Sequence, residues 1–369
     1  MKMKNLRIII SGGGTGGHIF PAISIANALK AKWADTEILF IGAEGRMEME
    51  KVPAAGYKII GLPVIGLKRK ISLSIFTFIF KTLKSYRKAK KIIKEFKPDV
   101  VVGVGGYASG PALKAAASLK IPYLVQEQNS YPGVTNKLLA KKASKICVAY
   151  DNMDKFFPAD KIIKTGNPIR ADIQNITNKS SEAFKFFDLN PNKATVLVIG
   201  GSLGARTINN SIANTLNEYV KSDVQVIWQT GKHYFDKADE IVGEINSDLI
   251  FVSDFIYRMD YAFSVADIII SRAGAGSISE LCVVGKPTIL VPSPNVAEDH
   301  QTKNALALST VNAAILVKDS DAEKELTKQT LELLNNKEQR ENLAQNIKKL
   351  ELADAANIIA DEIKKLANA

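Results

Sequence analysis

The residue best suited to chemistry is His18, which directly follows a glycine-rich turn, GGGTGG, at residues 12–17. An apolar run, RIIIS, precedes the turn, and a helix-like pattern follows it. A histidine at the start of a helix faces the positive end of the helix dipole, which favours the neutral imidazole. Because neutral imidazole accepts a proton, we predict that His18 is a general base for a hydroxyl nucleophile. A purely structural role, in which His18 fills the turn or caps its helix, stays open here.

The same turn fits the spacing G-x-G-x-x-G through Gly12, Gly14 and Gly17. Glycines let the backbone approach an anion, and the helix N-terminus supplies N–H donors. A nicotinamide-binding sheet would place an acidic residue at the end of its second strand. Here that strand ends FIGAEG, with Glu44 two residues beyond Gly42, and no dehydrogenase-like catalytic set follows. The turn therefore indicates an anionic ligand other than a nicotinamide dinucleotide.

Two further glycine turns occur in the second half of the chain, GGSLGAR after TVLVI and SRAGAGSISEL after DIII. In the latter, Arg272 leads into Gly274–Ser277, where small residues, a hydroxyl and a helix N-terminus suit a diphosphate. Glu280 lies one turn inside that helix and is spaced to accept hydrogen bonds from ribose hydroxyls. The segment after the next strand is rich in polar side chains suited to a polyhydroxylated ligand: Glu298, His300, Gln301 and Asn304.

The aspartates Asp319 and Asp321 have the D-x-D spacing of metal-dependent sugar transferases. They precede a helical run, so we interpret them as helix-capping and dipole-pairing residues. The chain has only three histidines, His18, His233 and His300, and no two are close in sequence. We therefore expect no protein-built metal site, and only structural or substrate-touching roles for the latter two histidines.

The two cysteines, Cys147 and Cys282, lie in apolar runs far apart in the sequence. We interpret them as buried thiols in a reducing compartment. The N-terminus, MKMKNLRIII, runs straight into a strand without a cleavage site, so we expect no signal peptide.

Short β-rich runs alternate with helical patterns along all 369 residues, and this length suits two domains. Continuous apolar strands separated by helices predict parallel sheets covered on both faces. We therefore predict an α/β protein of two tandem Rossmann-like, doubly wound domains with an interdomain cleft. The expected domains are residues 1–168, residues 169–345, and a helical segment 346–369 that packs back on the first domain. In such sheets ligands bind beyond the carboxyl ends of the strands.

The net charge of +11 is concentrated in a basic stretch at residues 68–97. This stretch encloses a charge-free segment, residues 71–80, which is too short to span a bilayer. One interpretation is a core helix followed by a solvated basic helix. Another is an interfacial patch that enters an anionic membrane; its expected contact residues are Ile75, Phe76, Ile79 and Phe80. Nucleic-acid binding is the least favoured, because no base-reading module accompanies the charge.

Seven ordered motifs resemble the MurG family, the membrane-associated N-acetylglucosaminyltransferases of peptidoglycan synthesis. The resemblance covers nearly the whole chain. The motifs are GGGTGGHIFPA at Gly12–Ala22, GVGGYASGPALKAA at Gly103–Ala116, QEQNSYPGVTNK at Gln126–Lys137, TGNPIR at Thr165–Arg170, GGSLGAR at Gly200–Arg206, SRAGAGSISEL at Ser271–Leu281 and EDHQTKNA at Glu298–Ala305.

The resemblance implies a GT-B glycosyltransferase fold with UDP-N-acetylglucosamine as donor and a polyprenyl-diphosphate-linked muramoyl-pentapeptide as acceptor. It implies that the second domain binds the nucleotide, with Ile256 at the uracil, Ser277 and Ser202 at phosphate and Glu280 at the ribose. Gln301 and Asn129 would contact the sugar, and Arg170 the diphosphate. The full implied binding set is Thr15, Gly16, Gly17, Asn129, Arg170, Ser202, Ile256, Ala275, Gly276, Ser277, Ile278, Ser279, Glu280 and Gln301. The family tends to carry a larger apolar residue at the position of Gly276 and threonine at that of Ser277.

The implied activity is an inverting transfer that converts the first lipid-linked intermediate of peptidoglycan to the second, a step in cell-wall growth, shape and division. We expect the protein to bind no cofactor. Stimulation of the transfer by a loosely bound divalent cation stays open here. The implied location is peripheral, on the cytoplasmic face of the bacterial inner membrane. Three rivals remain: a transferase with a glycerolipid acceptor, a UDP-N-acetylglucosamine epimerase on the same fold, and a non-catalytic membrane scaffold.

Overall fold

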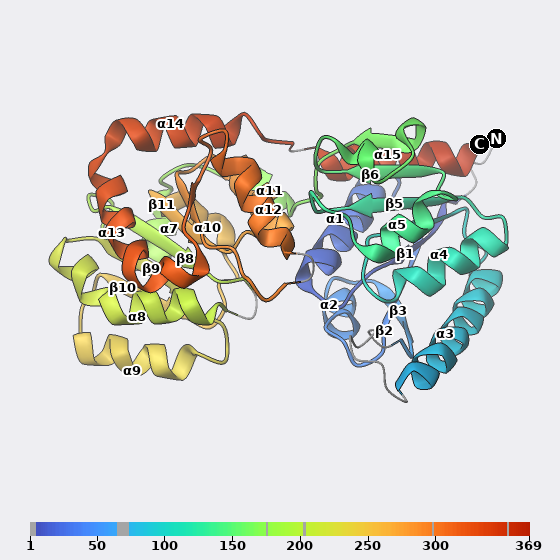
Figure 1. Ribbon diagram of the computed structural model, residues 1–369, viewed down its shortest axis with the longest axis horizontal. Helices are drawn as coiled ribbons and strands as arrows, with labels where there is room; N and C mark the ends of the chain where they lie inside the picture. Colours follow the sequence, from blue (N-terminus) through green and yellow to red (C-terminus); the bar gives the residue numbers. More distant parts are fainter. Residues whose placement is uncertain (1–4, 65–73, 175, 202–203, 297–298, 353) are drawn as a thin grey trace. The chain divides into compact units, whose positions relative to one another are not determined.

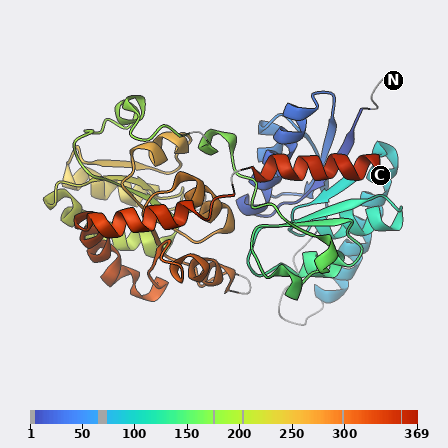
Figure 2. The same cartoon turned by 90° about the horizontal axis from the view of Figure 1, so that it is seen from above.

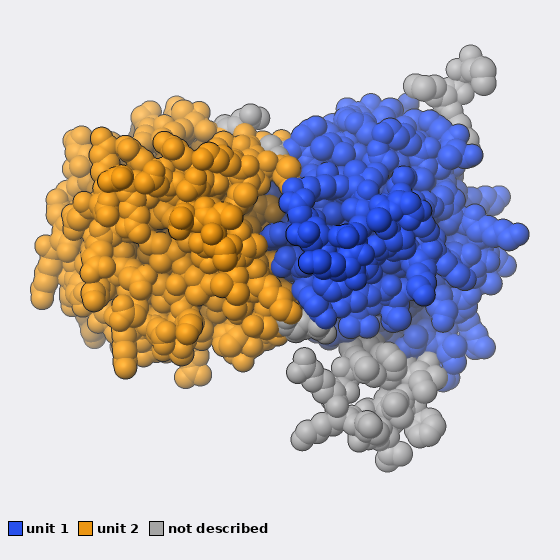
Figure 3. All heavy atoms as spheres, turned by 45° about the horizontal axis from the view of Figure 1, so that its top comes forward, with its two compact units in different colours: residues 1–170, 353–369 blue, residues 171–352 orange. Residues whose placement is uncertain are grey.

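Two parallel sheets organise the chain, one in each of two structural units. The computed structural model describes residues 5–64, 74–174, 176–201, 204–296, 299–352 and 354–369. Unit 1 comprises residues 1–170 and 353–369, and unit 2 comprises residues 171–352 (Figure 3). The returning segment begins later than the residue 346 expected from sequence, because the helix before it continues to Lys348.

The sheet of unit 1 has seven parallel strands in the order β3-β2-β1-β4-β5-β6-β7 (Figure 1). The isoleucines of the first strand alternate between the faces: Ile8 and Ile10 belong to one core cluster, and Ile9 belongs to the other. Both faces are therefore buried, as continuous apolar strands predict. The strands are β1 (Arg7–Ser11), β2 (Glu37–Ala43), β3 (Lys58–Leu62), β4 (Val100–Gly103), β5 (Tyr123–Glu127), β6 (Lys145–Val148) and β7 (Ile162–Lys164).

Helices cover both faces of this sheet. One face packs against α1 and against the C-terminal helix α15, which returns from the end of the chain and lies beside α1 (Figure 2). Lys32 of α1 bonds Asp361 of α15 at 2.7 Å. The helices of unit 1 are α1 (Gly16–Lys32), α2 (Glu48–Ala54), α3 (Ser74–Phe96), α4 (Ser109–Ser118), α5 (Val134–Ala140), η1 (Met153–Lys155), η2 (Ala159–Lys161) and α15 (Ala355–Asn368).

The sheet of unit 2 has six parallel strands in the order β10-β9-β8-β11-β12-β13. Its strands are β8 (Thr195–Ile199), β9 (Gln225–Gln229), β10 (Ile250–Ser253), β11 (Ile268–Ser271), β12 (Thr288–Leu290) and β13 (Ile315–Leu316). Its helices are α6 (Ala171–Gln174), α7 (Ser181–Phe186), α8 (Arg206–Lys221), α9 (Phe235–Ile245), α10 (Met259–Val265), α11 (Ala275–Val284), α12 (His300–Ser309), η4 (Asp319–Asp321), α13 (Ala322–Asn335) and α14 (Lys337–Lys348).

Both sheets reverse their strand order beside their first strand, as doubly wound folds do. The predicted fold class of two Rossmann-like domains is confirmed. The strands β3 and β7 were not predicted from the sequence. Both lie at edges of the first sheet and are only partly buried, so their apolar signal is weak.

Cys147 and Cys282 are both buried and free, which confirms the interpretation of buried thiols. Burial raises the pKa of each thiol to about 12. Among the helices that the structure describes, none is long and apolar enough to cross a bilayer.

Candidate active site

The turn before α1 places His18 at the start of that helix. Thr15 is the N-cap residue with extended backbone, and its carbonyl oxygen accepts from the N–H groups of His18 (3.1 Å) and Ile19 (3.2 Å). The Thr15 Oγ1 lies 3.1 Å from Nδ1 of His18. In the tautomer whose Nδ1–H donates to Thr15, Nε2 carries the lone pair that a general base needs. The predicted group of Thr15, Gly16, Gly17 and His18 therefore shares one turn.

The imidazole of His18 also packs against the turn after β4. Gly105 has φ +97°, and a Cβ added there would lie 2.6 Å from Cδ2 and 2.8 Å from Nε2 of His18. Gly106, with φ +83°, would place a Cβ 2.1 Å from the carbonyl oxygen of Gly13. The two glycine turns therefore fit together only because Gly105 and Gly106 carry no side chain.

A buried carboxylate that was not predicted from the sequence supports the first turn. Glu48, at the start of α2, is 1% exposed. Its Oε2 accepts from the N–H of Gly14 at 2.9 Å, and its Oε1 accepts from the N–H of Ala43 at 2.9 Å. A Cβ added at Gly13 would lie 2.1 Å from Oε1. Glu48 thus fixes the turn to the end of β2.

A second buried carboxylate, Glu127, organises the segment after β5. Its Oε1 accepts from the backbone N–H (3.0 Å) and the side-chain amide (3.2 Å) of Asn129. Its Oε2 accepts from Asn136 at 2.9 Å and from the N–H of Gly133 at 3.1 Å. Burial raises the pKa of Glu127, although these four donors oppose the shift. Glu127, the last residue of β5, therefore holds Asn129, which is predicted to contact sugar.

In unit 2, the predicted phosphate turn opens α11. Gly274 is the N-cap residue, and its carbonyl oxygen accepts from the N–H of Ile278 at 2.9 Å. Ser279 donates to the carbonyl oxygen of Ala275 at 3.1 Å. A Cβ added at Gly276 would meet no atom within 4 Å, so there is open space beside this glycine. Ala275, Gly276, Ser277, Ile278, Ser279 and Glu280 all lie within the first turns of one helix.

Ile256 and Gln301 also lie in unit 2, and both have hydrogen-bond partners there. The N–H of Ile256 donates to Oε1 of Gln229 at 3.2 Å, and that amide also donates to the carbonyl of Gly201 at 3.1 Å. Gln301 Oε1 accepts from the N–H of Ser293 at 2.9 Å, which links α12 to the end of β12. Ile256 therefore lies after the carboxyl end of β10, and Gln301 after that of β12. Doubly wound sheets bind ligands at these ends.

Several predicted residues stay untested by this geometry. Ser202 lies outside the described residues, as does Glu298. Arg170 is the last residue of unit 1 before the chain enters unit 2. The side chains of Ile75, Phe76 and Ile79 are also outside the description, whereas the predicted contact residue Phe80 is 68% exposed.

The D-x-D pair lies at a helix start, as expected for dipole pairing, but neither carboxylate makes a capping bond. Asp321 is the N-cap residue of α13 without a side-chain bond to the helix backbone. Asp319 instead bonds Arg272 and Thr207. Over the part of the chain that the structure describes, no three His, Cys, Asp or Glu residues group to hold a metal ion.

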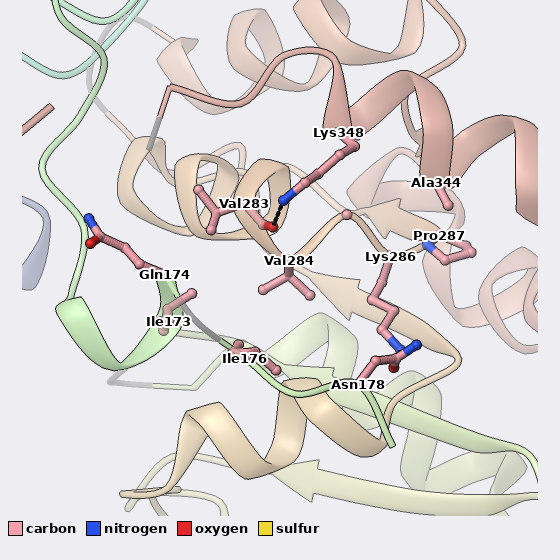
Figure 4. A pocket seen from close by; sticks show the side chains of 11 residues that line it. Ile173, Gln174, Ile176, Asn178, Val283, Val284, Lys286, Pro287, Ala344 and Lys348 are labelled. Atoms are coloured by element: carbon pink, nitrogen blue, oxygen red, sulfur yellow. Dashed lines mark hydrogen bonds between the residues drawn. The ribbon is translucent and has the colours of Figure 1, made fainter. Parts of the chain in front are cut away.

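A cavity of about 360 Å³ lies at the opposite end of α11 from the predicted phosphate turn (Figure 4). Val283, Val284 and Gly285 from the end of α11 line it, together with Lys286 and Lys348. Lys348 donates to the carbonyl of Val283 at 2.6 Å, and Lys286 bonds Asn178. Burial lowers the pKa of Lys286 to about 8. None of the predicted site residues lines this cavity.

Comparison with known proteins finds two domains of one glycosyltransferase family in this chain. The model of the glycosyltransferase family 28 N-terminal domain matches residues 8–148, and that of the family 28 C-terminal domain matches residues 195–359. The UDP-N-acetylglucosamine--N-acetylmuramyl-(pentapeptide) pyrophosphoryl-undecaprenol N-acetylglucosamine transferase of Parabacteroides distasonis is 60% identical over 364 residues, 99% of each chain.

Among solved structures, MurG of Acinetobacter baumannii is similar with a TM-score of 0.78 and 28% identity, over 98% of this chain and 99% of that one. A putative UDP-N-acetylglucosamine 2-epimerase from Listeria monocytogenes has a TM-score of 0.70 at 16% identity, over 98% and 96% of the two chains, and shares the fold alone. The two family 28 domains and the full-length similarity show that this chain belongs to the MurG family of N-acetylglucosamine transferases.

Proposed function

We propose that this protein transfers N-acetylglucosamine from UDP-N-acetylglucosamine to the muramoyl-pentapeptide of a polyprenyl-diphosphate lipid. The names of its relatives support this donor and acceptor. The observation that carries the mechanism is the position of His18 at the helix start, with Nδ1 beside Thr15. An epimerase activity is less well supported, because the similar epimerase from Listeria monocytogenes is only 16% identical to this chain.

The donor belongs in unit 2 in this proposal. The diphosphate of UDP lies at the N-terminus of α11, near Ser277 and Ser202, where N–H groups and the helix dipole favour negative charge. Glu280 accepts from the ribose and Ile256 meets the uracil. The N–H of Ile256 already donates to Gln229, so a bond from uracil to this N–H requires Gln229 to release it. Gln301 and Asn129 bind the sugar.

The reaction is a single displacement in this proposal. His18 takes the proton of the acceptor sugar hydroxyl, whose oxygen attacks the anomeric carbon from the face opposite UDP. The new glycosidic bond forms as the bond to the UDP oxygen breaks, so the linkage inverts from α to β. Arg170 and the N-terminus of α11 stabilise the charge that develops on the leaving diphosphate. This mechanism routes no step through a protein-bound metal, and a loosely bound divalent cation would add to the same charge stabilisation.

Replacement of His18 tests the mechanism. His18→Ala is expected to lower kcat by about 10²–10⁴-fold, the usual contribution of a general base, and to leave UDP binding unchanged. His233→Ala removes an exposed imidazole of unit 2 that has no expected proton-transfer role, and it is the matched control, which should keep the wild-type kcat. Transfer of labelled sugar to the lipid acceptor measures both. Wild-type turnover in His18→Ala would remove this residue from the mechanism.

We further propose that α3 rests on the anionic cytoplasmic face of the bacterial inner membrane. Phe80 and Leu83, 68% and 50% exposed, lie three residues apart on the helix, next to exposed Lys84 and Arg87. Apolar side chains framed by basic ones favour an anionic lipid surface. The opposite side of α3, with Ala89, Ile92 and Ile93, is buried in the core of unit 1.

Vesicle binding tests this surface. Phe80→Ser/Leu83→Ser is expected to lose most co-sedimentation with anionic vesicles, while Val311→Ser, an exposed apolar residue of unit 2, keeps it. Equal co-sedimentation of the double variant and the wild type would contradict the proposal. Binding to RNA in place of vesicles would point to a nucleic-acid partner instead.

A further inference from the structure

Arg272, at the end of β11, ties neighbouring strand ends together. Its Nη1 donates to the carbonyl oxygen of Val291, just beyond β12, at 3.0 Å. The same nitrogen donates to Oδ1 of Asp319, which follows β13. The side chains of Arg272 and Asp319 are 11% and 20% exposed, so the ion pair is largely shielded from water.

Asp319 extends this connection to a further strand end. Its Oδ2 accepts from Oγ1 of Thr207 at 2.9 Å. Thr207 lies in the first turn of α8, directly after the glycine turn that follows β8. The strands β8, β11, β12 and β13 are consecutive neighbours in the sheet. One ion pair therefore links the carboxyl ends of four adjacent strands.

The position of this ion pair in the sheet points to the ligand-binding edge. The strand order reverses between β8 and β11, and ligands of doubly wound sheets bind outside the carboxyl ends at that point. Arg272 also directly precedes the turn at residues 273–277. The carbonyl of Ala273, in this turn, accepts from the buried side chain of Asn304 at 3.3 Å.

Asp319 acts neither as a helix cap nor, over the described residues, as part of a metal-binding group. Well-packed apolar side chains often replace a shielded ion pair without loss of stability, so stability alone does not account for this pair. Paired to Arg272, the Asp319 carboxylate is also electrically compensated, so it does not oppose an anion at the N-terminus of α11. Its contacts therefore suit a role in holding the turn that precedes α11.

We propose that Asp319 and Arg272 form a positioning pair for the donor site, which holds the turn at residues 273–277 in the geometry that binds the diphosphate of UDP. The inference rests on the proposed function for its ligand. Neither residue needs to touch the donor. The pair acts by fixing the segment before α11 against the start of α8 and the segments that follow β12 and β13.

The test measures UDP affinity and steady-state kinetics in the full-length protein. Asp319→Asn is expected to raise the Kd for UDP and the KM for UDP-N-acetylglucosamine by about 10-fold, because small displacements of a binding group are costly. The KM for the lipid acceptor should stay unchanged. Asp321→Asn is the matched control: Asp321 lies on the same short helix, and its carboxylate accepts from Ser320 at 2.9 Å. It should leave both constants within about twofold.

Thr207→Val keeps the proposal testable if Asp319→Asn does not fold, since it removes only the hydroxyl that donates to Asp319. A rise of about threefold in the Kd for UDP is expected, from the loss of one supporting hydrogen bond. A merely structural pair would lower the melting temperature and leave UDP affinity unchanged well below that temperature, and this result would overturn the proposal. Failure of the wild-type protein to bind UDP would instead overturn the proposed function.

Discussion

The two glycine turns that open α1 and α11 share a strand–turn–helix form but are anchored in opposite ways. The first turn rests on Glu48, a carboxylate that accepts from the backbone N–H of Gly14. The second follows Arg272, whose partner Asp319 compensates its charge. The Glu48 carboxyl group thus takes up backbone donors of the first turn and of the end of β2. We infer that Glu48 fixes the shape of the turn that carries His18, whereas the turn before α11 receives the diphosphate of the donor.

Removal of Glu48 should have the largest effect on the difference between the two turns. Glu48→Ala leaves the N–H groups of half-buried Gly14 and buried Ala43 without their acceptor, which we expect to lower the free energy of unfolding by about 3 kcal/mol. Transfer should fall by about 100-fold as the turn that positions His18 loosens. UDP affinity should not change. Denaturant unfolding, transfer rate and UDP titration measure the three effects.

Glu50→Gln is the control for this change, because Glu50 lies on the same helix with its side chain 78% exposed. It should behave as wild type. A Glu48→Ala protein that transfers sugar at the normal rate would show that the first turn keeps its shape without this carboxylate. A matching loss of UDP affinity would place the donor at the first turn.

A smaller effect is expected from Gly105→Ala. The added Cβ would lie 2.6 Å from the His18 ring, and φ +97° is unfavourable for alanine. We expect a loss of about 10-fold in kcat with little change in the KM for the donor, because the imidazole must shift. Gly133→Ala, where an added Cβ meets no atom within 4 Å, is the control. Equal kinetics for the two variants would contradict the packing of Gly105 against His18.

The smallest effect should come from Gly276→Ala in the second turn. An added Cβ meets no atom within 4 Å, and alanine favours the helix more than glycine does. We expect UDP affinity within about twofold of wild type and stability unchanged or slightly higher. An increase of an order of magnitude in the Kd for UDP would show that the donor diphosphate lies directly over Gly276, and would locate the donor more closely.

Most of the fold could be predicted from the sequence, because parallel strands buried on both faces appear as continuous apolar runs. The turns around His18 and Ser277 could be located because their glycines directly follow such apolar runs. Edge strands such as β3 were missed, since they are only partly buried and their apolar pattern is weak.

The supporting residues could not be predicted in the same way. Glu48 lies in a charged segment, RMEMEK, whose carboxylates resemble a solvated helix face, and its partner Gly14 is 34 residues away. Asp319 has the local signature of a helix start, whereas its contact with Arg272 spans 47 residues. Contacts of this length form only when the strand ends come together in the folded sheet, so the sequence around one partner gives no local sign of the other.

The most direct test of the central claim is a crystal structure of the protein with UDP-N-acetylglucosamine. The account predicts the UDP diphosphate at the N-terminus of α11, beside Ser277, with the uracil near Ile256 and no nucleotide at Gly12–Gly17. A uridine diphosphate seated on the turn before α1, above Glu48, would contradict it.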